Sequence, residues 1–410
     1  MPQDTTSLRA EVIAIGDELT SGQRLDTNSQ WLSQQLGDLG IRTIFHTTIA
    51  DDLASNVAAF RAAAERVDVV VATGGLGPTA DDLTRECMAE AFELPLKLDQ
   101  SSLDTIRHMF ESRGREMPER NRVQAMFPEG SLAVPNPNGT APGVDLTANA
   151  CRMFALPGVP AEMKEMWRET VRPRLLEQFG EQLHPIFHYR LKCFGVGESS
   201  LEAMLPDLIR RGRVPTVGIT VSKATITLRA SAQAADEASF HALIQPTLDT
   251  IREKLGELVF GEEDDELQHA VSRLLVERGQ TVAVAEWQTS GLVATWLQEC
   301  SSDALAGGFL INSLDSAKSL LKIEGDVDSQ EFAESMAVGA REQAGADFGI
   351  SVGPFRGEPQ AKDAKVFLGL ATPTSSTAVS RRFAGHPDIL KPLTAKRALD
   401  ELRKHLLSSD

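Results

Sequence analysis

The stretch Val69-Val-Val-Ala-Thr-Gly-Gly-Leu-Gly-Pro-Thr-Ala-Asp-Asp-Leu-Thr84 decides the fold of the first part of this chain. The β-branched, apolar run over residues 67–72 predicts a strand buried on both faces of a parallel sheet. A helix is predicted over residues 82–92. A glycine turn between a strand and a helix points several N–H groups at one spot, which favours a phosphate or another anion. The glycines of this turn are Gly74, Gly75 and Gly77.

Two adjacent carboxylates follow the glycines, where they would repel a bare anion. Asp81 and Asp82 fit the same place if a divalent cation lies between them and phosphate oxygens. The plainer alternative is that the glycines only permit close packing and that the acids only cap the helix. Because the pattern Asp-Asp-x-Thr comes directly after the turn, we favour a site that also includes Thr79 and Thr84.

Composition excludes several classes of protein. The 410 residues predict two or three domains, and 42% hydrophobic residues suffice for ordinary cores. A net charge of −17 without a long basic run argues against nucleic-acid and membrane partners. We expect no membrane span and no signal peptide over residues 1–6. Four cysteines without C-x-x-C spacing predict buried free thiols in a reducing cytoplasm, rather than a zinc site: Cys87, Cys151, Cys193 and Cys300.

Strands and helices alternate through the first part of the chain, which predicts a parallel α/β sheet with ligands beyond its carboxyl ends. Asp17 and Glu18 follow the first predicted strand, so they could share one cleft with the tandem aspartates. An N-terminal cap for the next helix is an equally open interpretation of these two acids. The alternating elements are predicted over residues 10–16, 27–36, 40–46 and 51–66.

Two later stretches have loop chemistry suited to a ligand. The segment Val134-Pro-Asn-Pro-Asn-Gly-Thr-Ala-Pro-Gly143 is rigid and polar, so it either only turns the chain or holds backbone groups for a ligand. The segment Met153-Phe-Ala-Leu-Pro-Gly-Val-Pro-Ala-Glu-Met163 is a second strand, turn and helix start, suited to another anionic group. The candidate substrate-binding residues here are Asn136, Gly139, Thr140, Gly158 and Glu162.

Together these motifs resemble the competence/damage-inducible protein CinA family. The resemblance implies a molybdopterin-binding fold of the MoaB/MogA type over residues 1–175. It also implies hydrolysis of ADP-ribose at the pyrophosphate, giving AMP and ribose 5-phosphate. This activity depends on a divalent metal (Co²⁺, Mg²⁺ or Mn²⁺), and we assign Asp81, Asp82, Asp17 and Glu18 to it. The resemblance rests on Gly16-Asp-Glu-Leu19, Thr27-Asn28, Thr73-Gly-Gly-Leu-Gly-Pro-Thr-x-Asp-Asp-Leu-Thr84, Asn121-Arg-x-Gln-Ala-Met126, Pro135-Asn-Pro-x-Gly-Thr-Ala-Pro-Gly143 and Leu156-Pro-Gly-Val-Pro-x-Glu-Met163.

Residues 176–260 resemble the small α+β KH-like middle domain of CinA proteins. No G-x-x-G loop with flanking Lys or Arg is present in this part of the sequence. We therefore expect a spacer or a dimerisation module rather than an RNA-binding domain. The glutamates and aspartates of residues 256–265 are predicted to form a solvated acidic linker.

Residues 261–410 resemble the α/β CinA C-terminal domain, which deamidates nicotinamide mononucleotide in other members. The family pattern Ala-Glu-Ser-Cys-Thr-Gly-Gly reads here Ala285-Glu-Trp-Gln-Thr-Ser-Gly291, so Trp287 stands where the serine nucleophile belongs. In a second element, Asn312 stands at a tyrosine position and Lys318 survives as a basic partner without a nucleophile. A third element, the glycine loop over residues 351–359, is shortened.

The sequence therefore predicts a degenerate C-terminal domain that keeps its fold without deamidase activity. A working site rebuilt from Ser290 or Ser313 is the alternative.

Three functions stay open at this point. The first is a metal-dependent nucleotide-sugar pyrophosphatase, and the second is a protein that binds a nucleotide or pterin-like ligand without turnover. The third is an active deamidase of the pyridine nucleotide cycle. The family resemblance further implies a bacterial homodimer with a small nucleotide substrate, which we expect in the cytoplasm.

Overall fold

The computed structural model describes residues 8–210, 212–301, 303–358, 361, 363–382 and 386–408. The chain divides into two compact units between residues 187 and 188, and residues 233–240 belong again to the first unit. Unit 2 thus contains most of the predicted middle part and the whole predicted C-terminal part. The segment 1–6, where no signal peptide is expected, and Pro359 of the predicted glycine loop lie outside the described residues.

Unit 1 is built on a six-stranded sheet with the order β2-β1-β3-β8-β7-β6. The predicted parallel arrangement is present in β2, β1, β3 and β8, whereas β7 and β6 extend the sheet in antiparallel fashion. Asn149 and Ala150, both at positive φ, join β7 to β8, and a two-residue turn of this kind can only connect antiparallel strands. The strands span Arg9–Ile15 (β1), Arg42–Ile49 (β2), Val69–Thr73 (β3), Leu132–Val134 (β6), Gly143–Ala148 (β7) and Cys151–Leu156 (β8).

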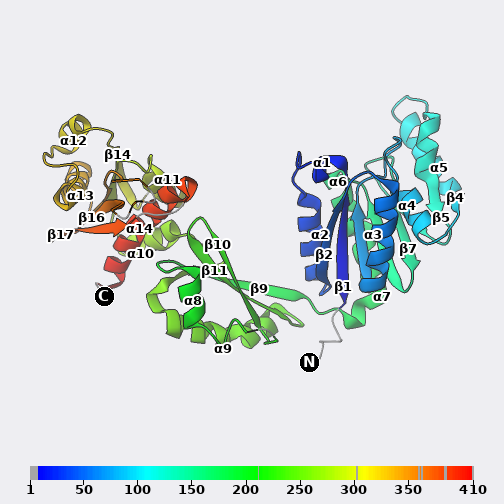
Figure 1. Ribbon diagram of the computed structural model, residues 1–410, viewed down its shortest axis with the longest axis horizontal. Helices are drawn as coiled ribbons and strands as arrows, with labels where there is room; N and C mark the ends of the chain where they lie inside the picture. The colour runs from blue at the N-terminus through cyan, green and yellow to red at the C-terminus, as the bar shows by residue number, and fades with distance from the viewer. Residues whose placement is uncertain are drawn as a thin grey trace. The chain divides into compact units, whose positions relative to one another are not determined.

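Helices cover both faces of this sheet (Figure 1). Val70 and Ala72 of β3 share an apolar core with α3 and α4, whereas Val69 and Val71 share another with α2 and α6. Successive strand residues point to opposite faces, so the buried run over β3 needs a helix layer on each side. The helices are α1 (Asp17–Thr20), α2 (Thr27–Asp38), α3 (Leu53–Arg66), α4 (Thr84–Ala91), α6 (Pro160–Met166) and α7 (Arg172–Phe179), with a π-helical turn, Trp167–Val171, between the last two.

A smaller substructure lies between α4 and β6 in the chain. Two short strands, β4 and β5, pair antiparallel, and α5 packs against the 3₁₀ segment that precedes β5. This insertion contributes one wall of a cavity described below. Its elements are β4 (Leu96–Leu98), α5 (Gln100–Glu111), the 3₁₀ segment Glu119–Ala125 and β5 (Met126–Pro128).

Unit 2 begins with a four-stranded sheet in the order β10-β11-β9-β12. The predicted acidic linker over residues 256–265 is wrong, because Val259–Glu262 forms β12 and pairs antiparallel with β9. Its acids do not depend on solvent alone: Glu263 and Asp265 form ion pairs with Arg190 and Arg273. The remaining elements are β9 (Ile186–Cys193), α8 (Glu198–Met204), β10 (Thr216–Ser222), β11 (Thr225–Gln233), α9 (Glu237–Leu255) and the 3₁₀ turn Gly256–Leu258. A further 3₁₀ turn, Gly180–Gln182, belongs to unit 1.

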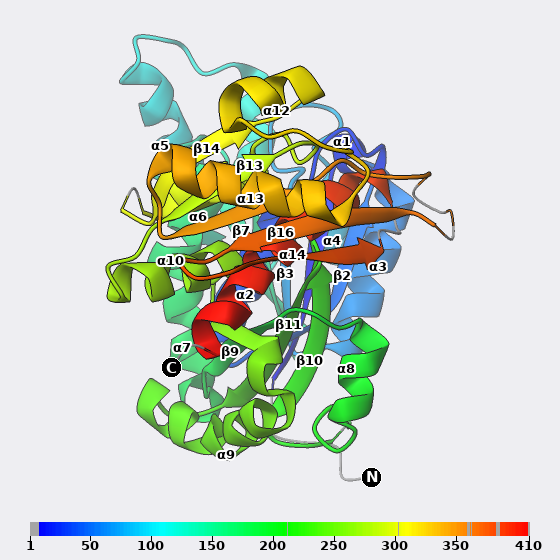
Figure 2. The same cartoon turned by 90° about the vertical axis from the view of Figure 1, so that its left-hand side faces the viewer.

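The second sheet of unit 2 has the order β14-β13-β15-β16-β17. β14, β13 and β15 run parallel to one another. β16 pairs antiparallel with β15, and β17 pairs antiparallel with β16. Helices α10, α11 and α14 share the apolar core of one face, whereas α12 and α13 cover the other, with α13 against β16 (Figure 2). The bounds are α10 (Leu267–Glu277), β13 (Val282–Glu286), α11 (Leu292–Cys300), β14 (Leu305–Leu310), α12 (Leu314–Leu321), α13 (Gln330–Ala344), β15 (Phe348–Val352), β16 (Lys365–Ala371), β17 (Ser376–Arg382) and α14 (Pro387–Ser408).

No helix among the described residues combines the length and the apolar character that crossing a membrane requires.

A buried charge lies within the first sheet. Glu11 of β1 is fully buried, and its carboxylate accepts two hydrogen bonds from Arg66, at 2.8 and 2.6 Å, and one from Thr47 at 2.5 Å. A buried carboxylate is tolerated only when its hydrogen bonds are satisfied in this way. The hydrogen bonds of Glu11 therefore connect α3 and β2 to β1.

We expect the substitution Glu11→Ala to destabilise unit 1 by about 2 kcal/mol, because Arg66 and Thr47 lose their acceptor. Arg66 is 38% exposed and can reach water, which keeps the cost below that of a fully enclosed pair. Amides of β1 that exchange only by global opening should then exchange about 30-fold faster by hydrogen-exchange mass spectrometry. The control is Glu65→Ala, which removes an exposed acid from α3, the helix that carries Arg66. Equal exchange rates in both variants would contradict this role of Glu11.

Candidate functional site

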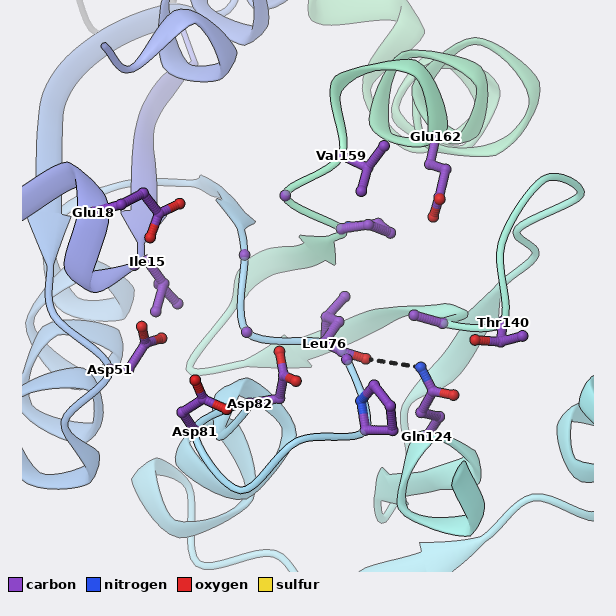
Figure 3. A pocket seen from close by; sticks show the side chains of 18 of the residues that line it. Ile15, Glu18, Asp51, Leu76, Asp81, Asp82, Gln124, Thr140, Val159 and Glu162 are labelled. Atoms are coloured by element: carbon purple, nitrogen blue, oxygen red, sulfur yellow. Dashed lines mark hydrogen bonds between the residues drawn. The ribbon is translucent and has the colours of Figure 1, made fainter. Parts of the chain in front are cut away.

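A pocket of about 540 Å³ opens beyond the carboxyl ends of β1, β3 and β8 (Figure 3). This is the edge at which open α/β sheets bind their ligands. Several predicted site residues lie outside the lining, namely Asp17, Thr79, Thr84, Asn136 and Gly139. The predicted residues that line the pocket are Glu18, Gly74, Gly75, Gly77, Asp81, Asp82, Thr140, Gly158 and Glu162.

The glycine turn after β3 has a backbone that larger residues cannot adopt. Gly74 and Gly75 have φ of 113° and 63°, and a Cβ on Gly74 would lie 2.1 Å from the carbonyl oxygen of Ile15. Thr84, which is buried, donates its hydroxyl to the carbonyl of Gly74 at 2.8 Å and its N–H to that of Gly75 at 3.1 Å. Thr84 therefore shapes the turn from behind and does not face the pocket.

The amide side of this turn is left for a ligand. Within the described part of the chain, the N–H groups of Gly75, Leu76 and Gly77 have no hydrogen-bond acceptor. The carbonyl of Leu76, in contrast, accepts from Gln124 Nε2 at 3.4 Å, as the dashed line in Figure 3 shows. Asn121 donates to Gln124 Oε1 at 2.9 Å, which fixes the orientation of that amide. Exposed amides in a turn of this kind suit phosphate oxygens.

Arg85 of α4 lies beneath the same turn and is buried. Its guanidinium donates to the carbonyls of Leu76, at 3.0 Å, and Pro142, at 2.7 Å, and it forms no ion pair with any described carboxylate. Burial lowers the pKa of Arg85 to about 10, so the group stays charged at neutral pH. Sequence analysis missed Arg85 because a charged residue on a helix is expected at the surface.

Four carboxylates line one side of the pocket. Figure 3 shows Glu18, Asp51, Asp81 and Asp82 on that side, with Thr140 opposite. Burial raises the pKa of Asp51, and the negative charges of its neighbours raise it further, despite a hydrogen bond from a backbone N–H. The pocket therefore has an excess of negative charge that a cation would relieve.

Asp17 holds a turn instead of facing the pocket. Its carboxylate accepts from the N–H of Asp51 at 3.1 Å, and Asp51 accepts from the N–H of Asp17 at 3.0 Å. The reciprocal bonds fix the position of Asp51, which was not predicted as a site residue. Asp17 does not cap a helix, because it lies in the first turn of α1 and its side chain makes no capping hydrogen bond there.

Thr79 organises the tandem aspartates. Its N–H donates to Asp82 Oδ2 at 2.9 Å, and its hydroxyl donates to the same oxygen. The pKa of Asp81 lies below its usual range, chiefly because the Thr79 hydroxyl is within hydrogen-bonding reach. Arg24, which was also missed, is the one basic side chain in the described lining of this pocket.

Asn28 connects the turns after β3 and β8 by hydrogen bonds. Its Nδ2 donates to Thr73 Oγ1 at 3.1 Å and to the carbonyl of Gly158 at 3.0 Å. Thr73 Oγ1 in turn donates to the carbonyl of Pro157 at 3.0 Å. The turns after β3 and β8 therefore meet, and a Cβ on Gly158 would lie 3.6 Å from the Cα of Gly74.

The proline-rich loop over residues 135–142 is held by Asn136. The Asn136 Nδ2 donates to Glu162 Oε2 at 2.7 Å and to the carbonyl of Ala141 at 3.0 Å. Its Oδ1 accepts from the N–H groups of Asn138 and Gly139, at 3.1 and 2.9 Å. All hydrogen-bonding groups of this amide are used within the protein, so Asn136 shapes the loop rather than facing the pocket.

The structure brings the altered elements of the C-terminal domain to one end of the second sheet of unit 2. Trp287 follows β13, and its backbone N–H donates to the carbonyl of Val352 at 3.0 Å. The Trp287 ring packs edge-on against Phe332, with centroids 6.0 Å apart. Asn312 follows the neighbouring β14, and Lys318, farther along α12, is paired with Glu324 at 3.4 Å.

The two serines named as alternative nucleophiles have different surroundings. Ser290 has a φ of 60° and accepts a hydrogen bond from Lys391 Nζ at 2.9 Å. Ser313 caps α12 by accepting from the N–H of Ser316 at 3.1 Å. The buried Glu286, at the end of β13, accepts hydrogen bonds from the N–H groups of Val293 and Ala294 and so fixes the start of α11.

No three His, Cys, Asp or Glu side chains among the described residues come close enough together to hold a metal ion by themselves. Mg²⁺ is usually held by one or two carboxylates and completed by water and substrate phosphates. The oxygen donors of the pocket, and the charge excess around Asp51, fit a cation bound in that manner.

Comparison with known proteins gives the class first. Three family models match the chain: the probable molybdopterin binding domain over residues 11–177, the damage-inducible protein CinA KH domain over 188–261 and the CinA C-terminal domain over 264–406. The predicted molybdopterin-binding-like, KH-like and CinA C-terminal folds are thereby confirmed.

Full-length relatives then give the family. The CinA-like proteins of Crocosphaera subtropica and Dictyoglomus thermophilum are 36% and 35% identical, each over 98% of this chain and 100% of theirs. A solved structure of CinA from Thermoplasma acidophilum, of unknown function, is 31% identical and covers 41% of this chain and 98% of its own, with a TM-score of 0.39. This chain belongs to the CinA family.

We expect the substitution Asp51→Asn to stabilise the metal-free protein by less than about 1 kcal/mol, since the group is only half-buried and solvent screens its repulsion. A raised folded-state pKa means that stability is lost as the pH rises through it, so the advantage of Asn should grow between about pH 4 and pH 7. Thermal unfolding of both proteins measures this.

Added Mg²⁺ or Mn²⁺ should remove the advantage, because a bound cation favours the wild-type carboxylate. Asp38→Asn, an exposed acid outside the pocket, is the control. A difference between wild type and Asp51→Asn that is independent of pH and of divalent cations would contradict the repulsion at Asp51.

Proposed function

We propose that unit 1 hydrolyses the phosphoanhydride of a nucleotide diphosphate such as ADP-ribose, with the help of a divalent metal. The observation that supports this most is the pairing of opposite chemistries in one pocket: backbone amides without an acceptor in the described chain and Arg24 suit phosphates, and carboxylates suit a cation. A pocket that only bound an anion would gain nothing from four acids beside it.

One or two of the four carboxylates Glu18, Asp51, Asp81 and Asp82 would hold the metal, and water and substrate phosphates would complete its coordination. Their oxygen donors favour Mg²⁺ or Mn²⁺, and Co²⁺ is the third candidate. When bound, such a cation would neutralise phosphate charge and make a water a better nucleophile.

The protein groups then have distinct tasks. The amides of Gly75–Gly77 bind phosphate oxygens, and the buried charge of Arg85 strengthens the positive potential beneath them. The turn at Gly158, which meets Gly74, faces the second phosphate. Asp51, whose pKa is raised, is the carboxylate best suited to accept a proton from the attacking water.

The reaction consumes one water. Its oxygen bonds to one phosphorus of ADP-ribose, the anhydride P–O bond breaks, and the products are AMP, ribose 5-phosphate and one proton. The expected homodimer and the cytoplasmic location remain predictions.

We further infer that the C-terminal domain lacks deamidase activity. At the end of β13 the Trp287 ring packs into the apolar cluster around Phe332, where it offers no nucleophile to an amide. Ser290, whose hydroxyl oxygen lies 2.9 Å from Lys391 Nζ, is the alternative nucleophile that the ammonia assay below tests.

Asp82→Asn should lower kcat for ADP-ribose by at least about 100-fold, because the variant keeps the size of the side chain and loses its charge. AMP formation by the full chain, with Mg²⁺, Mn²⁺ or Co²⁺, is the measurement. Glu86→Gln removes a charge from α4, which follows Asp82, outside the pocket lining and should change kcat less than about twofold.

Unchanged turnover in Asp82→Asn would contradict the assignment of the tandem aspartates. Binding of ADP-ribose without metal and without AMP formation would favour the alternative of a binding protein.

Incubation of the full chain with nicotinamide mononucleotide should release no ammonia above a protein-free control. The reversion Trp287→Ser should not restore release, because Asn312 and the loop over residues 353–358 also differ from the family pattern. Ammonia release that disappears in Ser290→Ala would instead establish a rebuilt site.

A further inference from the structure

A second cavity, of about 380 Å³, adjoins the pocket in unit 1. It lies between one face of α5 and the proline-rich loop over residues 135–142. Thr140 lines both cavities. Of its neighbours, Ala141 lines the first pocket, and Gly139 and Pro142 line the second cavity. The two cavities are therefore neighbours across a single loop segment.

The loop between the cavities is held in place by the contacts already described. Asn136 reaches across to Glu162, which lines the first pocket, and a Cβ on Gly139 would lie 2.2 Å from Glu162 Oε2. A side chain at position 139 would therefore have to displace the Glu162 carboxylate, which Asn136 holds. The loop that separates the two cavities is thus tied to α6.

The lining of the second cavity is mostly apolar and suits a flat ring. Ile106 is buried and Met109 is half-buried, and the loop adds Pro135, Pro137 and Pro142. Methionine sulfur and proline rings make favourable contacts with aromatic faces. Such cavities, with few polar groups, bind the ring portions of small ligands.

The one charged side chain in the described lining of this cavity is the carboxylate of Asp99. Asp99 accepts from the N–H of Ser102 through Oδ1 at 2.7 Å, and Oδ2 has no partner in the described chain. No lysine or arginine belongs to the described lining. A phosphate is therefore disfavoured here, whereas an amino group on a ring finds an acceptor.

We propose that the cavity between α5 and the proline-rich loop is the subsite for an amino-bearing nucleobase, with Asp99 reading the exocyclic amine. The proposal rests on the proposed function, and it adds the orientation of the substrate and the class of base. The diphosphate lies in the first pocket, the base lies in the second cavity, and Thr140 lies beside the sugar that joins them.

The first test fills the cavity. Thr105 is exposed on the cavity face of α5, so Thr105→Phe blocks the subsite without disturbing the core. KM for ADP-ribose should rise at least about tenfold. Hydrolysis of ribose 5-diphosphate, which keeps the sugar and the anhydride but has no base, should change less than about twofold.

The matched control is His108→Phe, which places the same ring on an exposed position of the same helix outside the lining. It should leave both substrates unaffected. Equal KM values for ADP-ribose in Thr105→Phe and His108→Phe would overturn the proposal.

The second test changes the hydrogen bond. Hypoxanthine diphosphoribose replaces the exocyclic amine by a carbonyl, so wild-type protein should prefer ADP-ribose by about tenfold in kcat/KM. Asp99→Asn keeps the cap of α5, because Asn and Asp cap helices equally well, and it can donate to the carbonyl. The preference should therefore fall to about one in this variant, and an unchanged preference would overturn the role of Asp99.

The two proposals fail in different ways. If no diphosphate is hydrolysed with any metal, the proposed function fails, and the subsite is tested by calorimetric titration of ADP-ribose and AMP. Weaker binding of both in Thr105→Phe than in His108→Phe would still support the subsite. Absence of binding by wild type, or equal binding by the two variants, would overturn it.

Discussion

The buried guanidinium of Arg85 is the constraint on which the rest of the first unit depends. A charge without a carboxylate partner is expensive to bury, and here two backbone carbonyls accept from its terminal nitrogens, whereas its Nε has no partner in the described chain. One belongs to the glycine turn at Leu76 and the other to Pro142 in the proline-rich loop. The side chain thereby fixes two loops that are 66 positions apart in the sequence, counting from 76 to 142, and it does so from inside the protein.

The distribution of charge in the pocket follows from that arrangement. Arg85 and Gln124 bind the carbonyl of Leu76, whereas the N–H groups of Gly75, Leu76 and Gly77 have no acceptor in the described chain. Of the carboxylates, Glu18 and Asp51 follow β1 and β2, where Asp17 positions Asp51, and Asp81 and Asp82 follow β3. Opposite charges are thus separated across a short distance without neutralising one another, as a phosphate and a cation bound together would require.

The sequence predicted the parts of the site that depend on local backbone chemistry. The glycines, the tandem aspartates and four parallel strands were predictable because turns, β-branched runs and alternation are short-range signals. Asp51 was missed because Asp52 beside it caps α3, which made the pair look like one helix start. Asn136 was assigned to the ligand because polarity alone does not reveal that its amide is fully bonded inside the loop. The acidic run over residues 256–265 was misassigned because its arginine partners lie in other elements.

The packing of Trp287 against Phe332 has an evolutionary consequence. An indole that fills an apolar cluster becomes part of the support of α13 and β13, so replacing it by a small hydroxyl residue would leave a void and cost about 2 kcal/mol. On the proposal that this domain has no deamidase activity, a return to serine at this position alone would therefore lower stability without restoring a reaction, and natural selection would keep the tryptophan.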